Sequence, residues 1–116
     1  MMSSYAPILE ALTRQRGVRA SLIVSESDGL VVDAHVRFGQ DGERIAALAA
    51  SMYRKARMSA AAARLGSVGF LQLDAERGRL CAAGGRSDLV LVVVADASAN
   101  VGLIRVELLR ALESLE

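Results

Sequence analysis

The segment DLVLVVVA, residues 88–95, constrains the fold most, because seven consecutive apolar residues leave no polar side for solvent. A strand of this composition is buried on both faces and lies in the interior of a sheet. Helices must therefore cover both faces of that sheet. The chain has 116 residues, enough for one domain spanning residues 1–116 with its own core. Because 53% of the residues are hydrophobic and only 3% are aromatic, the core must be aliphatic.

Three segments have helical patterns, and each has a recognisable start. Pro7 lies in the first turn of the first segment, where a missing amide is tolerated. Asp41 is the expected N-cap of the second and Asn100 that of the third. Gly102 is expected to let the third helix press close to the sheet. The three segments cover residues 3–17, 41–66 and about 100–114.

Strand patterns occupy residues 18–25, 30–36, 67–74, 79–84 and 88–95. Asp28-Gly29 predicts a tight hairpin between the first two strands. In the second strand, alternation places Leu30, Val32, Ala34 and Val36 on one face. Strands joined by tight turns pair antiparallel, so the expected class is α+β in the order αββαβββα, rather than a parallel nucleotide-binding fold.

The long helical segment has two contrasting sides on a helical wheel. The stripe expected to lie on the sheet comprises Ile45, Leu48, Ala49, Met52, Tyr53, Ala56, Ala60 and Ala63. The outer arc combines Arg44, Arg54, Lys55, Arg57 and Arg64 with Ala46, Ala47, Ala50, Met58, Ala61 and Ala62. Two interpretations of the outer alanines stay open. They either serve helix propensity alone, or they let a second helix approach while arginine stems cover its flanks.

Charge and residue types exclude several classes of function. The net charge is +1 and no cationic block stands out, which argues against nucleic-acid binding. Cys81 and His35 are the only cysteine and histidine, too few for the usual zinc site. We expect Cys81 to be a packing residue and His35 to face solvent or a polar edge. Phosphate-loop and nucleophile-elbow patterns do not occur in the sequence. The chain is therefore expected to have no cofactor, no metal and no catalytic residue, and not to be an enzyme.

The hydropathy pattern gives no sign of a membrane protein. No uncharged apolar run approaches the ~18 residues that span a bilayer, and the N-terminus lacks a signal-peptide pattern. We expect a cytoplasmic protein that does not insert into membranes.

Three features together resemble the roadblock/dynein light-chain domain family. They are SDGLVV in the first hairpin, NVGLIR after the apolar strand, and the order of helices and strands. The resemblance extends from Leu9 to about Leu112. It implies a five-stranded antiparallel sheet with the long helix on one face and the terminal helices on the other, an architecture similar to longin and profilin domains.

The resemblance also implies a function. Subunits of this family usually pair through the third strand and the long helix into a ten-stranded sheet, and bacterial members resemble the gliding-polarity activator of a small Ras-like GTPase. We therefore expect a homodimeric regulator or scaffold that activates or recruits such a GTPase. A small-molecule sensor is the alternative, because the many alanines could leave a cavity. The expected dimer or partner interface comprises Arg44, Ala47, Ala50, Arg54, Arg57, Met58, Ala61, Phe70 and Gln72.

Overall fold

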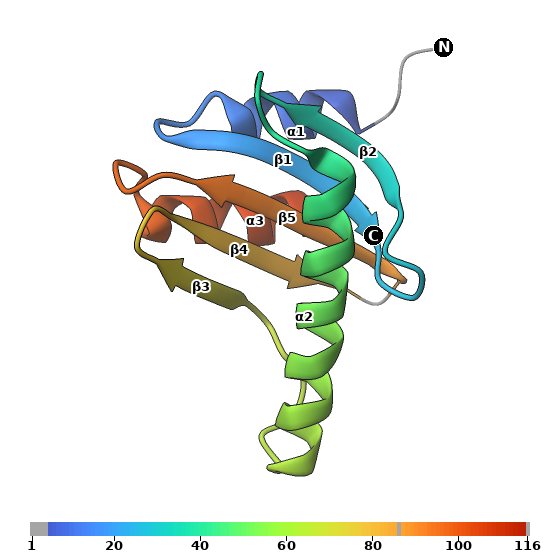
Figure 1. The fold of residues 1–116 in the computed structure, drawn as a ribbon. Coiled ribbons are helices and arrows are strands. Elements are labelled where there is room, and N and C mark those ends of the chain that lie inside the picture. The colour runs from blue at the N-terminus through green and yellow to red at the C-terminus, as the bar shows by residue number, and fades with distance from the viewer. Residues whose placement is uncertain (1–4, 86, 116) are drawn as a thin grey trace.

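The computed structural model describes residues 5–85 and 87–115, and its element order confirms the predicted α+β fold (Figure 1). Residues 3 and 4 of the first predicted helical segment lie outside the described residues. The elements are α1 (Ala6–Thr13), β1 (Val18–Ser25), β2 (Val31–Val36), α2 (Gly42–Ala62), β3 (Leu71–Ala75), β4 (Gly78–Gly84), β5 (Leu89–Ala95) and α3 (Val101–Leu115).

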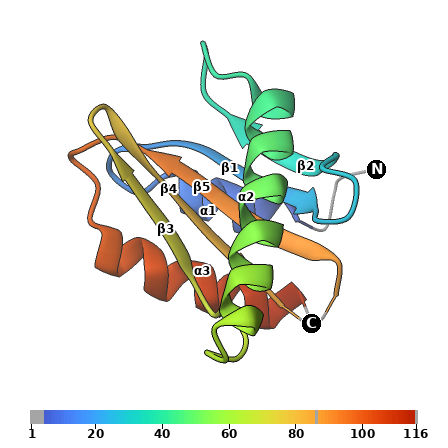
Figure 2. The ribbon, with the colours of Figure 1, turned by 60° about the horizontal axis from the view of Figure 1, so that its bottom comes forward.

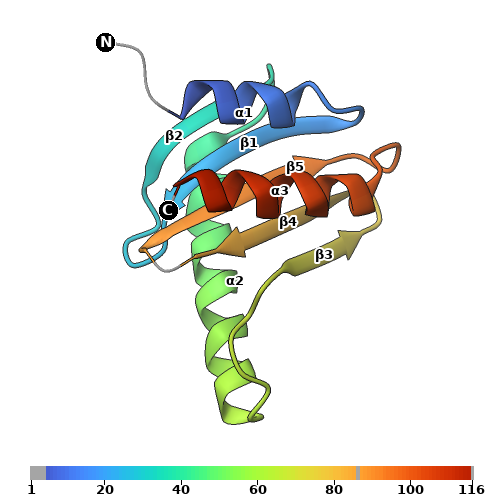
Figure 3. The same cartoon turned by 180° about the vertical axis from the view of Figure 1, so that it is seen from behind.

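The five strands form one sheet in the order β2-β1-β5-β4-β3, and every neighbouring pair is antiparallel. The all-apolar strand β5 is central, as predicted. α2 crosses one face of the sheet, while α1 and α3 cover the other, as the view from behind shows (Figure 3). The sheet therefore separates two layers of core.

The two layers differ in the size of the side chains that their helices contribute. Under α1 and α3 the buried residues are Leu9, Leu12, Val18, Ile23, Cys81, Leu91, Val93, Ala95, Ala99, Ile104 and Leu108. Under α2 they are Ala20, Leu22, Val24, Ala46, Ala49, Ala50, Tyr53, Ala82, Val90 and Val92. The terminal helices thus supply leucine and isoleucine, and α2 supplies mainly alanine.

The predicted alternation along the second strand is wrong in its first half. The pairing register with β1 shifts between Val31 and Asp33, which leaves Val32 as an extra residue. A bulge of this kind inverts the side-chain alternation. As a result Val31, rather than Val32, packs on the α2 side together with Ala34 and Val36.

α2 is rotated about its axis relative to the sequence prediction. Its buried side consists of Ala46, Ala49, Ala50 and Tyr53. The pattern assigns Ala46 and Ala50 to the outer arc and Leu48 to the sheet, and these assignments are wrong, since Leu48 is 61% exposed. The alanines let the helix axis approach the sheet closely, and the long Tyr53 side chain reaches β4 from there.

α2 is also longer than the sheet is wide. Its 21 residues span about 32 Å, whereas five strands span about 19 Å. The helix begins at the β2 edge, where Gly42 lies beside Val36. Its C-terminal half therefore projects beyond the β3 edge (Figures 1 and 3). No residue between 54 and 67 is buried.

α3 begins as predicted, because the side-chain oxygen of Asn100 accepts a hydrogen bond from the Leu103 amide at 3.0 Å. The role predicted for Gly102 is wrong: a Cβ there would meet only the Asn100 side chain within 4 Å, so it does not bring the helix to the sheet. Glycine is instead required at position 17, just before β1, because the backbone there lies close to the connection from β5 to α3. That residue has φ +82°, and a Cβ would lie 2.6 Å from a carboxylate oxygen of Asp96.

Candidate interaction surface

Tyr53 fixes the middle of α2 on the sheet. Its hydroxyl donates to the carbonyl oxygen of Val68 at 3.1 Å and accepts from the Gly84 amide at 2.9 Å. A Cβ at position 84 would lie 2.7 Å from this hydroxyl, so the contact requires glycine there. Burial raises the pKa of Tyr53. The neutral hydroxyl thus joins α2 to the end of β4 and to the segment that leads into β3.

Glu26, in the turn between β1 and β2, fixes one flank of α2. Its carboxylate accepts hydrogen bonds from Nε and Nη2 of Arg57 at 2.6 and 2.8 Å. Its backbone oxygen accepts a hydrogen bond from Arg54. Two arginines of the expected interface therefore contact the chain's own turn.

Asp88, just before β5, fixes the same turn from the other side. Its carboxylate accepts hydrogen bonds from the hydroxyls of Ser25 and Ser27, each at 2.7 Å, and from the Ser27 amide at 3.1 Å. These hydrogen bonds, that of Ser25 first, hold the pKa of Asp88 below its usual value. The turn is thereby held between α2 and β5.

A groove of about 1090 Å³ lies beside these contacts, between the C-terminal half of α2 and the connection from β4 to β5. Four polar side chains of its lining already hydrogen-bond to other parts of the chain, namely Glu26, Tyr53, Arg57 and Asp88. These four side chains therefore already have partners within the chain. The groove therefore adds no specific support to the alternative of a ligand sensor.

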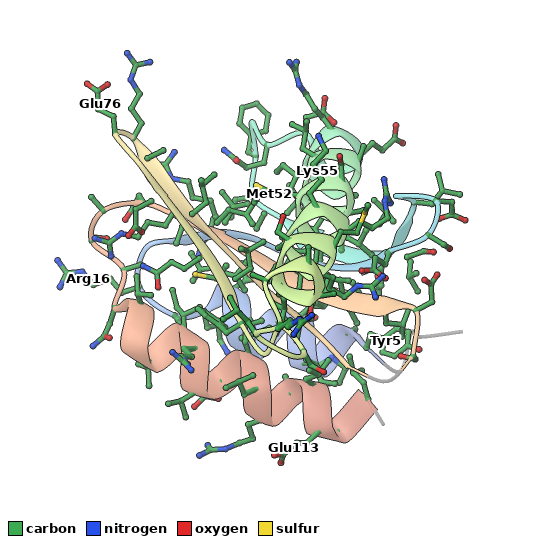
Figure 4. All side chains as sticks on the ribbon, turned by 90° about the horizontal axis from the view of Figure 1, so that it is seen from below. Tyr5, Arg16, Met52, Lys55, Glu76 and Glu113 are labelled. Carbon is green, nitrogen blue, oxygen red and sulfur yellow. The ribbon has the colours of Figure 1, made fainter. Side chains whose placement is uncertain are left out.

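The opposite flank of α2 faces β3 and is open. Figure 2 shows the β1–β2 turn on one side of α2 and β3 on the other, and Figure 4 shows Met52 on the β3 side. Ile45 and Ala56, seven residues before and four residues after Met52, share that flank. All three are only partly buried. Below them on the same face of the sheet lie Leu71, Leu80 and Val94, which are also partly buried, and Leu73, which is exposed.

The two edges of the sheet differ in their capacity to accept another strand. The β2 edge has the bulge at Val32, and the Ala34 amide donates to the Asp33 carboxylate at 2.9 Å. The β3 edge has no register shift along its pairing with β4. Bulges and inserted charges discourage pairing at an edge, whereas a regular edge favours it. The β3 edge is therefore the one suited to a neighbouring strand.

The other residues of the expected interface are scattered. Ala50 is fully buried within the chain, so its assignment to an interface is wrong. Phe70 lies on the face of the sheet that α1 and α3 cover, where the Arg105 guanidinium is 5.1 Å from the centroid of the Phe70 ring. Gln72 hydrogen-bonds to Asp74. The remaining members, exposed on α2, are Arg44, Ala47, Met58 and Ala61.

Sequence reasoning missed Leu73 and Glu26, for different reasons. Alternation along the third strand puts Leu73 and Gln72 on opposite faces of the sheet. The sequence therefore already indicated that Leu73 lies on the face away from Gln72, which is the face that α2 covers. Glu26 is 31 residues from Arg57, and nothing in the sequence spacing relates them.

The two residues with reactive side chains are placed as predicted. Cys81 is buried in β4, and burial raises the pKa of its thiol. His35 is exposed on β2. Among residues 5–85 and 87–115, no three His, Cys, Asp or Glu side chains gather in a way that could hold a metal ion. The helices in that part of the chain are too short or too polar to cross a bilayer.

Two comparisons of the sequence agree with one another. The model of the Roadblock/LC7 domain family matches residues 6–95. The uncharacterized protein MJ1340 of Methanocaldococcus jannaschii is 31% identical over 110 residues, which cover 94% of each chain. A second protein of that organism, MJ0310, is 30% identical over the same length and share of each chain.

Solved structures have the same fold. A Roadblock/LC7 domain from Streptomyces avermitilis has a TM-score of 0.85 and 23% identity, covering 97% of this chain and 95% of that chain. The gliding protein MglB from Thermus thermophilus has a TM-score of 0.83 and 20% identity, covering 99% and 90%. MglB from Myxococcus xanthus has a TM-score of 0.82 and 19% identity, covering 97% and 94%. Because the family match spans most of the sequence, this chain belongs to the Roadblock/LC7 domain family.

Proposed function

We propose that this protein is a homodimeric, non-enzymatic regulator or scaffold that binds a small Ras-like GTPase. Family membership supports this proposal, because the resemblance described above implies paired subunits and GTPase binding. The observation that carries it is the open apolar flank of α2 beside a regular, unpaired β3 edge.

A second copy fits this surface by symmetry. Antiparallel pairing of two β3 strands would join the sheets, and a twofold axis would bring the same patch of each copy together. The projecting half of each α2 would then lie over the other copy's sheet. Its apolar side would cover Leu71, Leu73 and Leu80, which a single copy leaves partly or largely exposed. This arrangement accounts for a helix that is longer than its own sheet.

The pairing is tested by light scattering on the purified protein and a Leu73→Asp variant. Wild type should have twice the chain mass, and the variant should shift toward monomer because a carboxylate would enter the apolar contact. Leu103→Asp is the matched control, since Leu103 of α3 is 49% exposed and Leu73 is 46% exposed. A monomeric wild type, or equal dissociation of both variants, would contradict the proposed pairing.

GTPase binding is tested separately, by calorimetry with each purified small Ras-like GTPase of the source organism. Each GTPase is loaded with GDP or with a non-hydrolysable GTP analogue. Tighter binding of one nucleotide state would indicate regulation, because only unequal affinity shifts a switch. Equal binding would indicate recruitment. Failure of every GTPase to bind in either state would overturn this part of the proposal.

A further inference from the structure

One aromatic side chain lies entirely outside the core. Phe38, in the connection from β2 to α2, is 106% exposed. The other three aromatic residues, Tyr5, Tyr53 and Phe70, are at least partly buried. Figure 2 shows the connection extending beyond the body of the sheet, at the top of the view. A phenylalanine ring gains free energy when it leaves water, and packing within this chain does not provide that gain for Phe38.

A closed turn presents this ring. The Gln40 amide donates to the carbonyl oxygen of Arg37 at 3.2 Å, so Phe38 and Gly39 are the central residues of the turn. Gly39 has φ +89°, and Phe38 does not have a positive φ, a combination typical of a type II turn. The Arg37 side chain donates to backbone oxygens at the start of β1 and the end of α1, at 2.9 and 3.0 Å. The turn is therefore fastened at its base, which limits the entropy lost when its tip binds.

Arginines surround the turn. Two neighbouring segments, residues 11–25 and 34–40, contain four arginines and no Asp or Glu: Arg14, Arg16, Arg19 and Arg37. All four are exposed, and Figure 4 shows Arg16 directed away from the body of the chain. A hollow of about 370 Å³ is lined in part by Arg19, Arg37 and the phenyl ring. The apolar tip and the positive charge thus belong to one surface.

The acids near this surface do not cancel its charge. Asp96, across the hollow, is 3.7 Å from Arg19 and offsets one of the four arginines. Asp41 and Glu43 lie at the start of α2, where the helix N-terminus and Arg44 offset their charges. The side of the turn that faces the hollow therefore keeps an excess of positive charge.

We propose that the Phe38 turn, residues 37–40, and the four arginines around it form a peripheral attachment site for an anionic lipid surface. The ring enters the boundary between headgroups and acyl chains, while the guanidinium groups contact lipid phosphates. A bilayer is nearly flat on this scale, so it meets the side chains that project, as this ring does. Its mobile headgroups can match arginines that are not arranged around one fixed ligand. A protein partner would instead need a preformed pocket for the ring.

The site does not depend on the proposed function. It lies beside β2, whereas the proposed pairing uses β3 at the opposite edge of the sheet, so a monomer and a dimer both leave it uncovered. Attachment is peripheral, because no helix among the described residues is long and apolar enough to cross a bilayer. One ring and a few charges give weak, reversible binding that added salt should reduce.

The position of the ring is tested with fluorescence, because the sequence contains no tryptophan. Phe38→Trp places a single fluorophore at the tip of the turn. With vesicles of phosphatidylglycerol and phosphatidylcholine in equal parts, its emission should shift to shorter wavelength and be quenched by lipids brominated in the upper acyl chain. Leu103→Trp is the matched control, since Leu103 is 49% exposed on α3. Its emission should not change.

Affinity is tested by co-sedimentation with the same vesicles at low ionic strength. Phe38→Ser should bind about tenfold more weakly, because a large apolar side chain no longer leaves water. Arg14→Gln/Arg16→Gln should bind about twentyfold more weakly, the loss expected for two charges near an anionic surface. Arg105→Gln/Arg110→Gln makes the same change in net charge on exposed positions of α3, and should keep most of the affinity.

The lipid composition provides a further control. Vesicles of phosphatidylcholine alone should bind wild type poorly, because they lack net negative charge. Inorganic phosphate should compete with the anionic vesicles no better than chloride at equal ionic strength, since attachment requires the lipid surface and not the anion alone.

Three outcomes would overturn the inference. They are no binding of wild type to the anionic vesicles, a loss in Phe38→Ser no greater than in Leu103→Ser, and equal losses in the two arginine pairs. The first would leave the ring to a pocket on another protein. Light scattering on the same variants reports pairing separately, and each should keep the mass of wild type. Failure of vesicle binding and failure of the proposed function are therefore distinguishable.

Discussion

The two faces of the sheet are completed in different ways. The face under α1 and α3 is filled by large aliphatic side chains of two helices, and it is finished within one copy of the chain. The face under α2 receives three alanines and one tyrosine from a helix that has no buried residue after Tyr53. The first face thus serves the stability of a single copy, and the second leaves apolar surface for another molecule. Mutations should separate these two properties.

The largest loss of stability should come from a substitution on the face under α1 and α3. Leu108→Ala removes a fully buried side chain of α3 and leaves a cavity. We expect the free energy of unfolding to fall by about 2–5 kcal/mol, measured by urea denaturation at fixed protein concentration. The light-scattering mass should stay that of wild type. A monomer at concentrations where wild type is a dimer would show that the two faces are not independent.

A smaller effect is expected where α2 lies close to the sheet. Ala50→Leu forces extra atoms into a fully buried position, so the free energy of unfolding should fall by about 1–3 kcal/mol. Ala61→Leu makes the same change on the exposed half of the same helix. It should alter the free energy of unfolding by no more than about 0.5 kcal/mol. Equal losses in the two variants would contradict the division of α2 into a packed half and a projecting half.

The hydrogen bonds of Tyr53, at the boundary between these halves of α2, should contribute less to the free energy of unfolding. Tyr53→Phe removes the hydroxyl that bonds Val68 and Gly84, and we expect a loss of about 1 kcal/mol. Because burial raises the pKa of Tyr53 above the usual 10.0, wild type should also lose stability as the pH rises past that value. The phenylalanine variant should lack this contribution. Identical alkaline unfolding of both proteins would show that the hydroxyl is not held as described.

The smallest effect concerns the turn that flanks α2. The pKa of Asp88 is lowered from 3.8, so its contribution to stability is present above that value and is lost as the pH falls through the lower folded-state pKa. Asp88→Asn should therefore lower the unfolding temperature at neutral pH, and its difference from wild type should shrink as the pH falls below 3.8. A thermal melt series across this range measures the difference. A difference in unfolding temperature that does not change with pH would show that the variant acts through the packing of the side chain rather than through its charge.

Prediction from sequence succeeded where one segment determines its own environment. The run of apolar residues placed β5 at the centre, and the chemistry of Asn100 located the start of α3. The faces predicted for β2 and α2 failed because they depend on other segments. The bulge at Val32 follows from pairing with β1, and the apolar arc of α2 is wider than one sheet requires.

The candidate surface was predicted less well than the fold. The wheel correctly identified small residues on more than one side of α2, but it could not decide which side lies on the sheet. The prediction therefore placed Met52 on the sheet and Ala50 on the outer arc. In the structure Ala50 is buried, and Met52 lies on the flank toward β3 (Figure 4). Contacts such as that of Glu26 with Arg57 join distant positions and appear only once the chain is folded.

The length of α2 has a consequence for how the protein responds to its own abundance. The last turns of α2, residues 58–62, are exposed or only partly buried, and short helical segments with few tertiary contacts fray in water. If those turns are covered by a neighbouring copy, their order follows mass action, so dilution unwinds them and accumulation restores them. Amide hydrogens of residues 58–62 would then exchange more slowly as concentration rises, and the amount of protein in the cell would decide how much of the helix is formed.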